Sequence, residues 1–207
     1  DWYFSLFQNE TILRALGNSL KVGLCATFFA TLIGSLAALG LSRYEFKGRG
    51  LVGSLVFIPL VVPEIVMAIS ILTLFLSLGV KLSLFTVILA HIAFCIAYVT
   101  ITVRTRLAGL DPSLDLGATR WETFRLVTLP QIWPGIISGA LLCFTLSFDD
   151  FVITFFNAGV GAGNLPMAVH SMLKFGVTPE INAISTIMLV FSISLMVVYT
   201  FIDRPKS

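Results

Sequence analysis

Five long apolar runs dominate this sequence, and they restrict the possible folds more than any other feature. A helix of about 20 apolar residues crosses the hydrocarbon core of a bilayer, whereas barrel strands alternate over about ten residues. The runs are too long and too continuously apolar for barrel strands, and they cover residues 22–41, 51–80, 82–103, 132–156 and 183–202. We therefore predict an all-α, polytopic transmembrane helical bundle with five visible spans, forming a single domain over residues 1–207.

The composition agrees with an integral membrane protein. Hydrophobic residues make up 57% of the chain and charged residues only 12%, about half the charged fraction of a soluble domain. A soluble protein of this length needs a charged surface, and this chain lacks the residues to build one. We therefore expect the lipid bilayer to surround most of the molecule.

Lysine and arginine are distributed unevenly between the segments that connect the apolar runs. In membrane proteins the cytoplasmic segments carry the excess of these residues. Nine of the thirteen fall on one set of segments: Arg43, Lys47, Arg49, Arg104, Arg106, Arg120, Arg125, Arg204 and Lys206. This bias predicts an external N-terminus and a cytoplasmic C-terminus, and it explains the net charge of +2 without a nucleic-acid partner.

The longest inside segment contains the signature of a short amphipathic helix. Thr119 and Glu122 have the spacing of a capping box, in which each side chain satisfies a free backbone N–H group. Apolar side chains follow at helical spacing: Trp121, Phe124 and Val127. We predict a helix over about residues 120–129 beneath the membrane, ended by Pro130 and followed by a span that starts near Pro134.

Three uses of this helix are compatible with its residues. It could lie in the headgroup layer, pack on the spans of its own chain, or dock into a groove on a partner. The chain has no G-x-x-x-x-G-K-[ST] sequence, so any nucleotide must be bound by another subunit.

The segment "DLGATRWETFRLVTLPQIWPGI" resembles the cytoplasmic Glu-Ala-Ala loop of permease subunits in binding-protein-dependent ABC importers. Gly117 would be the motif glycine and Leu129–Pro130 the end of the motif. The resemblance implies a type I importer permease whose loop, at about residues 104–131, docks into a separate ATPase subunit. It also implies which residues lie nearest that contact: Ala118, Thr119, Trp121, Glu122 and Phe124.

Four further segments resemble the spermidine/putrescine branch of this family: "PEIVMAISILTLF", "LAHIAFCIAYV", "SFDDFVITFF" and "GVTPEINAISTIMLV". The resemblance implies an inner-membrane subunit that moves polyamines from a periplasmic binding protein into the cytoplasm. The implied partners are two copies of an ATPase, which would hold ATP and magnesium, and a second, related permease chain. The chain itself would bind no cofactor and catalyse no covalent reaction.

Two features depart from the pattern of that family. Its permeases have six spans, whereas five are visible here, and only "DPSLDL" stands between Leu110 and Gly117 where the Glu-Ala-Ala turn belongs. We expect a helix before Asp1 and several residues after Leu114 to be absent from this chain rather than from the natural protein. An intact mass near 22.6 kDa would contradict that expectation.

Three acids lie within or at the edge of apolar runs: Glu64, Asp149 and Asp150. An ionised side chain at mid-bilayer costs about 2.5–3.5 kcal/mol, so such groups usually face a bundle interior or a watery cavity. No lysine or arginine lies within two helical turns of them in sequence. A cationic substrate would offset this cost, whereas the alternative use is an idle, solvated position at the outer interface.

The two neighbouring aspartates should point about 100° apart on a helix, so we expect only one to face a path directly. The other could accept a hydrogen bond from Ser147 or a neighbouring span. Glu64 follows two prolines, and a broken helix often lines a cavity. The candidate substrate path therefore comprises Glu64, Ser147, Asp149 and Asp150, to which the resemblance adds Trp2 as a cation–π face.

The remaining polar groups leave other uses open. His91 could be functional or could donate one structural hydrogen bond to a neighbouring helix. The three cysteines lie singly in different runs, without metal-ligand spacing. Import of another small solute, such as a ferric complex or an amino-acid derivative, is an alternative function. An intramembrane acid–base enzyme and a passive cation channel are two others. Small residues at four-residue spacing predict close helix packing, within the bundle or against a second subunit.

Overall fold

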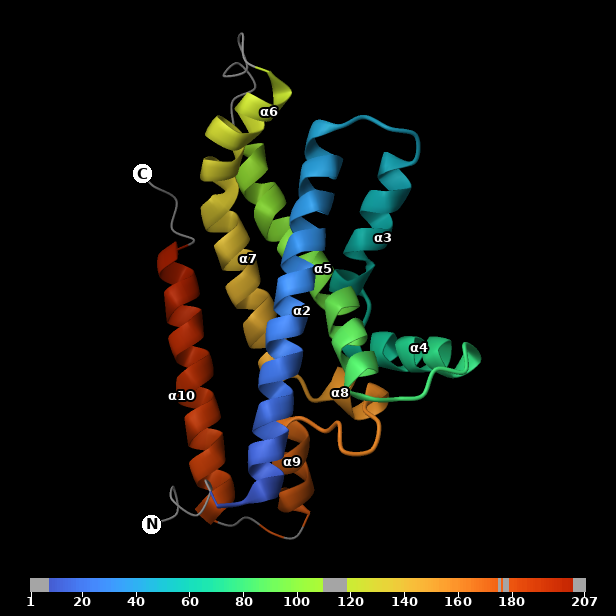
Figure 1. Ribbon diagram of the computed structural model, residues 1–207, viewed down its shortest axis with the longest axis vertical. Coiled ribbons are helices and arrows are strands. Elements are labelled where there is room, and N and C mark those ends of the chain that lie inside the picture. Colours follow the sequence, from blue (N-terminus) through green and yellow to red (C-terminus); the bar gives the residue numbers. More distant parts are fainter. Residues whose placement is uncertain (1–7, 110–118, 175, 177–178, 203–207) are drawn as a thin grey trace.

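The computed structural model describes residues 8–109, 119–174, 176 and 179–202, and throughout this part the regular structure is helical (Figure 1). Four helices are long and apolar enough to span a membrane, and a bent pair brings the number to five. The spans are α2 (Glu10–Arg43), the pair α3 (Arg49–Val61) and α4 (Glu64–Ser77), α5 (Leu84–Ala108), the helix ending in α7 (Leu129–Asp149), and α10 (Pro179–Ile202). The predicted all-α class is confirmed.

Helices α2, α5 and α7 form the centre of the bundle, and small residues let them approach closely. A Cβ atom on Gly34 of α2 would lie 2.8 Å from the Cβ of Val99 on α5. A Cβ on Gly139 of α7 would lie 3.4 Å from the Cα of the same valine. Ala26 and Ala30 are fully buried on α2. The small-residue pattern therefore serves packing within this chain.

The second predicted span is broken where its prolines indicated. Helices α3 and α4 meet at an angle of 117°, with Pro63 as the residue that precedes α4. Val62 and Pro63 have extended backbone angles, so the helical hydrogen-bond ladder is interrupted there. Pro59, in contrast, lies inside α3 without ending it. As a result α4 lies crosswise to the long helices, at one side of the bundle, and contacts the short helix α8 (Val152–Asn157) (Figure 1).

The prediction that Pro130 ends a short helix is wrong, because the chain stays helical from Arg120 to Asp149. α6 (Arg120–Thr123) passes into the π-helix η2 (Phe124–Thr128), which passes into α7. The N–H of Leu129 donates to the carbonyl of Phe124, five residues back. This wider turn makes room for the ring of Pro130, which in an α-helix would clash with the carbonyl four residues back. Pro134 lies inside α7, not at its start.

The predicted run 132–156 is also interrupted, because α7 ends at Asp149 and α8 begins at Val152. Asp150 has extended backbone angles, with φ −65° and ψ 132°. Beyond α8 the chain passes through a glycine-rich segment into α9 (Leu165–Leu173), which packs beside the lower end of α2 and α10. These breaks put polar backbone groups inside the bundle, where they need partners.

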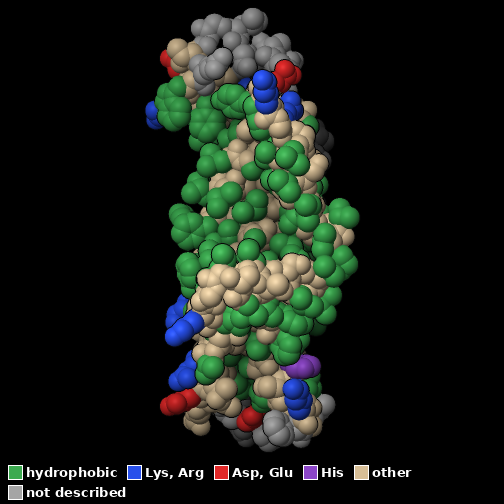
Figure 2. Space-filling view, turned by 90° about the vertical axis from the view of Figure 1, so that its right-hand side faces the viewer, with side chains coloured by type: hydrophobic (Ala, Val, Ile, Leu, Met, Phe, Trp, Pro, Cys, Tyr) green, Lys and Arg blue, Asp and Glu red, His purple; other side chains and the backbone are tan. Residues whose placement is uncertain are grey.

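Apolar side chains cover the middle of the molecule and charged side chains gather toward its two ends (Figure 2). Neighbouring helices cover the spans unevenly. Half of the residues in the most apolar 18-residue stretch of α5 are buried, whereas only 17% are buried in the corresponding stretch of α10. The exposed face of α10 consists of large apolar side chains such as Leu189, Ile193 and Met196. Such a face suits lipid or another membrane helix.

Candidate functional site

The break between α7 and α8 is built around the side chain of Asp150. Its carboxylate accepts hydrogen bonds from the backbone N–H of Ile153 at 3.1 Å and of Thr154 at 2.9 Å. The hydroxyl of Thr154 donates to the same carboxylate at 3.1 Å. Asp150 therefore satisfies backbone groups that the start of α8 would otherwise leave free. The residue is only 7% exposed.

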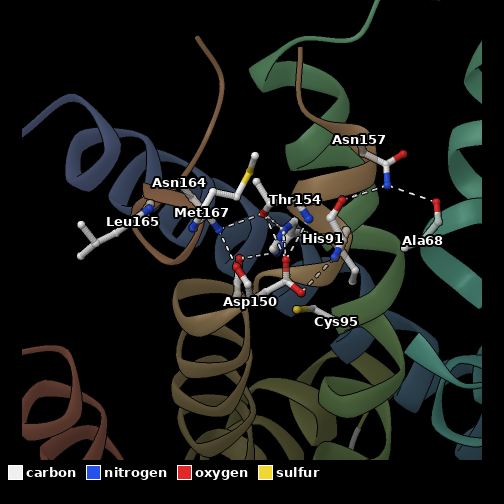
Figure 3. A network of polar contacts seen from close by, with 12 residues as sticks. Ala68, His91, Cys95, Asp150, Thr154, Asn157, Asn164, Leu165 and Met167 are labelled. Atoms are coloured by element: carbon white, nitrogen blue, oxygen red, sulfur yellow. Dashed lines mark hydrogen bonds and ion pairs between the residues drawn. The ribbon is translucent and has the colours of Figure 1, made fainter. Parts of the chain in front are cut away.

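His91 of α5 lies against this carboxylate, completely buried (Figure 3). Its Nε2 is 3.2 Å from Oδ2 of Asp150 and 3.1 Å from the hydroxyl of Thr154. Its Nδ1 is 2.8 Å from the hydroxyl of Ser147 on α7. One imidazole ring thus joins α5 to the end of α7 and to the start of α8.

Asn164, the residue that precedes α9, extends the same network (Figure 3). Its amide nitrogen donates to the backbone carbonyl of Asp150 and, at 3.0 Å, to the hydroxyl of Thr154. Its amide oxygen accepts from the N–H of Met167 and so caps α9. The side chain of Ser19 on α2 accepts from the N–H of Leu165. The polar network therefore reaches from α5 to α2 and α9.

The other end of α8 is fixed by Asn157, which is fully buried. Its amide nitrogen donates to the carbonyl of Ala68 on α4 at 3.2 Å and to that of Ile153 at 3.0 Å (Figure 3). Its backbone carbonyl accepts from the hydroxyl of Thr86 on α5 at 2.8 Å. These contacts tie the crossing helix α4 to the network at Asp150.

Glu64 is the first residue of α4, directly after the break, and it is partly buried. Its carboxyl group is close enough to that of Asp150 for the two to interact electrostatically. The two helix breaks thus bring together acids that are far apart in the sequence. This pair, Glu64 and Asp150, is called the acid pair below.

Asp149 points away from the acid pair, as the helical geometry predicted. Its carboxylate is exposed and accepts a hydrogen bond from Ser192 of α10 at 2.6 Å. Asp149 borders an open cavity of about 540 Å³ between α9 and α10. The rings of Phe151 and His170 line this cavity with their centroids 4.7 Å apart. We predicted that one aspartate would accept a hydrogen bond from Ser147 or from a neighbouring span. Asp149 accepts one from the neighbouring span α10, whereas Ser147 contacts His91.

The predicted capping box is present at the start of α6. The N–H of Thr119 donates to the carboxylate of Glu122 at 2.9 Å, and the N–H of Glu122 donates to the hydroxyl of Thr119 at 3.3 Å. Trp121 is 67% exposed, with its ring 5.7 Å from that of Phe124. Leu129 is partly buried and Pro130 is exposed. Three other predicted residues, Trp2, Gly117 and Ala118, lie outside the described residues.

Sequence reasoning missed the polar residues that complete the network. Thr154, Asn157 and Asn164 follow Asp150 at intervals that place them on different sides of a helix and a loop. The signal that could have found them is a cluster of amide and hydroxyl side chains beside an apolar run, because buried polar groups need partners. Within the described residues no group of three His, Cys, Asp or Glu side chains could hold a metal ion.

Comparison with known proteins places this arrangement in a family. Residues 30–205 match the family described as the binding-protein-dependent transport system inner membrane component. The chain is 42% identical over 212 residues to the spermidine/putrescine transport system permease protein PotC of Haemophilus influenzae, covering 100% of this chain and 82% of that protein. It is 42% identical over 200 residues to the putrescine transport system permease protein PotI of Escherichia coli strain K12, covering 91% and 71%.

Solved structures share the fold at low sequence identity. An amino acid ABC transporter crystallised with histidines superimposes with a TM-score of 0.76 at 18% identity, covering 99% of this chain and 98% of that chain. A bacterial ABC transporter involved in the import of the acidic polysaccharide alginate gives a TM-score of 0.74 at 19% identity, covering 99% and 82%.

The relatives are transport permeases and not enzymes, so the acid–base enzyme alternative is set aside. The family match covers most of the chain, and the helical fold is that of solved importer permeases. The chain therefore belongs to the binding-protein-dependent inner membrane components: it is a multi-pass permease of a bacterial ABC importer, which works with an ATPase and a binding protein.

Proposed function

We propose that this chain is the permease subunit that moves spermidine and putrescine across the inner membrane. In this proposal a periplasmic polyamine-binding protein delivers the substrate, and a second, related permease completes the membrane channel. Two ATPase copies, which hold ATP and magnesium, drive the cycle, and the C-terminus lies in the cytoplasm. The names of the 42%-identical relatives support the substrate class. The observation that carries the proposal is the acid pair inside the bundle.

In the described residues the acid pair has no permanent positive charge beside it, although hydrogen bonds from the protein satisfy Asp150. In the part of the chain that the structure describes, the ionic partner of Asp150 is His91, and no lysine or arginine pairs with either acid. Carboxylates in a membrane interior are costly unless a cation or hydrogen bonds stabilise them. The ammonium group of a polyamine would supply the missing positive charge, and its attraction would be strong where water is excluded.

Asp149 provides a second, separate contact for an elongated cation. It lies at the cavity between α9 and α10, beside the rings of Phe151 and His170. An aromatic face next to a carboxylate suits an alkylammonium chain, since ammonium groups are attracted to π faces. Polyamines carry several positive charges along a flexible chain, so acids in two places fit them better than a compact metal-like cage does.

The opposite end of the molecule carries the proposed ATPase contact. At the end where α6 lies (Figure 1), the exposed ring of Trp121 packs against the partly buried ring of Phe124. Because α6 continues without a break into α7, movement of α6 would pass directly to the helix that ends at Asp149 and Asp150. This continuity links nucleotide-driven movement to the acid pair.

Uptake of labelled spermidine into proteoliposomes that contain the whole complex tests the proposal. We expect Glu64→Gln and Asp149→Asn to lower uptake at least about tenfold, which corresponds to about 1.4 kcal/mol for a lost charge contact. The matched control is Glu45→Gln, at an exposed acid in the connection between α2 and α3. Each variant must retain its ATPase subunit. Undiminished uptake by both test variants would contradict the proposed path.

Asp150→Asn needs a separate assessment, because Asp150 also caps α8. An asparagine there retains one acceptor oxygen, so we expect an assembled complex with reduced uptake. Competition by unlabelled putrescine, an amino acid and a ferric complex identifies the substrate class. Displacement of spermidine by putrescine alone is the expected result.

A further inference from the structure

His91 has no task in the proposal above, although its position is one of the most tightly defined in the molecule. It is completely buried in α5, and both ring nitrogens contact polar side chains. Its partners come from the end of α7 and the start of α8, and one of them belongs to the acid pair. A buried imidazole with this many contacts can control the orientation and the charge of its neighbours.

The hydrogen-bond network assigns the proton on the ring. The hydroxyl of Thr154 has a single proton, which it donates to Asp150, and it accepts from the amide of Asn164. Nε2 of His91 faces this hydroxyl oxygen and a carboxylate oxygen of Asp150, both of which act as acceptors. Nε2 therefore carries the proton. Nδ1 of the neutral ring is then the acceptor for the hydroxyl of Ser147.

This assignment gives the carboxylate of Asp150 a complete set of donors. Two backbone N–H groups, the hydroxyl of Thr154 and Nε2–H of His91 surround it. A carboxylate accepting this many hydrogen bonds is held ionised and in one orientation. Asp150 is thus a fixed negative charge, while Glu64 lies beside it at the helix break.

A second proton on His91 would change the charge of this region without dismantling it. Nδ1–H could then donate to Ser147, whose hydroxyl oxygen also accepts. The imidazolium would offset the negative charge of Asp150, which an ammonium group meets beside Glu64. Among the described residues the other titratable groups in the region are the thiols of Cys95 and Cys143 on α5 and α7 and the phenol of Tyr98 on α5, in addition to Glu64 on α4 and Asp150 itself.

We propose that His91 is a positioning residue for the passage of the cation. As a neutral imidazole it orients Asp150 beside Glu64 and leaves the negative charge of Asp150 in place. As an imidazolium it offsets Asp150 and weakens the hold of the pair on an ammonium ligand. This inference rests on the proposed function, because it assigns a task within the same substrate path.

The test compares His91→Gln, His91→Ala and His170→Gln in the whole complex in proteoliposomes. A glutamine amide can donate to Asp150 and accept from Ser147, but it cannot take up a proton. His170, the other histidine of the chain, is exposed on α9 and provides the matched control. Uptake of labelled spermidine is measured over a range of concentrations at about pH 7.5 and about pH 5.5, which bracket the usual charge change of histidine.

We expect the KM of the wild-type complex to rise several-fold at the acidic pH, with a smaller change in maximal rate. His170→Gln should behave in the same way. His91→Gln should transport at both pH values with a KM that rises less at the acidic pH than that of the wild type, because Glu64 stays titratable, and His91→Ala should be impaired at both. Spermidine binding by the isolated binding protein, measured at each pH, corrects for delivery.

Different results overturn different statements. If His91→Gln retains the pH dependence of the wild type, or if His91→Ala transports normally, the role of His91 is wrong and the proposed function stands. If the wild-type complex moves no spermidine at either pH, the proposed function fails and takes this inference with it.

Discussion

At the residue scale, the end of α7 shows how one backbone step separates two neighbouring acids. Asp149 is the last residue of the helix and reaches Ser192 on α10. Asp150 has an extended backbone and turns its carboxylate into the bundle, toward His91. Two residues with the same side chain therefore meet different surroundings, one an open cavity and the other a closed hydrogen-bond network.

Asn164 offers a direct test of that closed network. Its buried amide donates to Asp150 and Thr154 and accepts from Met167, so Asn164→Ala leaves several polar groups without partners. We expect the substitution to lower the stability of the complex by about 1–3 kcal/mol. The change is measured as a shift in the thermal unfolding midpoint. Asn182→Ala, at an exposed position on α10, is the control, and equal midpoints for the two variants would contradict the structural role.

The sequence could identify the acids of the site but not most of their partners. Glu64 and Asp150 stand out because carboxylates are rare in apolar runs. Ser147 and His91 are 56 positions apart, and Asp149 and Ser192 are 43 apart. Spacing along the chain gives the face of a helix on which a residue lies, but it does not give which other helix covers that face. The use of His91 therefore stayed open until the packing was known.

At the element scale, some of the prolines in the apolar runs end a helix and others do not. Pro63 marks a true break because the backbone before α4 is extended. Pro59 and Pro134 lie inside helices, and Pro130 is accommodated by the π-helix before it. A proline weakens a helix by about 3 kcal/mol, which neighbouring helices in a membrane bundle can offset. The sequence shows where such a weakness lies, whereas packing decides whether the helix ends there.

The start of α6 carries a prediction for the proposed ATPase contact. Trp121 is exposed, and its ring contacts that of Phe124, the first residue of η2. Aromatic anchors often contribute 2 kcal/mol or more to an interface, so Trp121→Ala should weaken ATPase binding by about 30-fold. Binding of the purified ATPase to the permease in nanodiscs measures this. Phe46→Ala, at an exposed aromatic residue between α2 and α3, should bind normally. Equal affinity of the two variants would exclude Trp121 from the contact.

At the scale of the whole molecule, the distribution of basic residues predicts which end faces the cytoplasm. The connection between α2 and α3 lies at the same end as α6, and α9 lies at the opposite end (Figure 1). The first end carries Arg43, Lys47 and Arg49. The positive-inside rule predicts that this is the cytoplasmic end and that the glycine-rich segment before α9 is external.

Cysteine labelling in intact cells checks this orientation. In a chain whose three native cysteines are replaced by serine or alanine, Val160→Cys should react with a membrane-impermeant maleimide from outside, because Val160 is fully exposed. Lys47→Cys, exposed at the other end, should react only after the cells are permeabilised. The reverse pattern would invert the topology.

The sequence predicted five spans, and the described residues contain four, or five if the bent pair counts as one span; it did not predict the faces that meet lipid or another subunit. The apolar runs are all strongly hydrophobic, yet half of the most apolar part of α5 is buried, against 17% of that of α10. In lipid an apolar side chain gains little from one apolar neighbour over another, so hydrophobicity alone does not rank the faces. The close contact of Gly34 with Val99 shows that small residues carry that information instead.

The π-helix η2 has a consequence for the angle through which α6 is rotated about the helix axis relative to α7. Each residue of an α-helix turns the chain by about 100°, and a π turn holds one residue more than an α turn. The direction in which Trp121 faces is therefore set by the number of residues between it and α7, independently of any contact that Trp121 makes. A shift of the wide turn along Phe124–Thr128 would rotate α6 against α7 while both stay helical. The π-helix thus sets the angle between α6, the element proposed to contact the ATPase, and α7, the span that ends at Asp149.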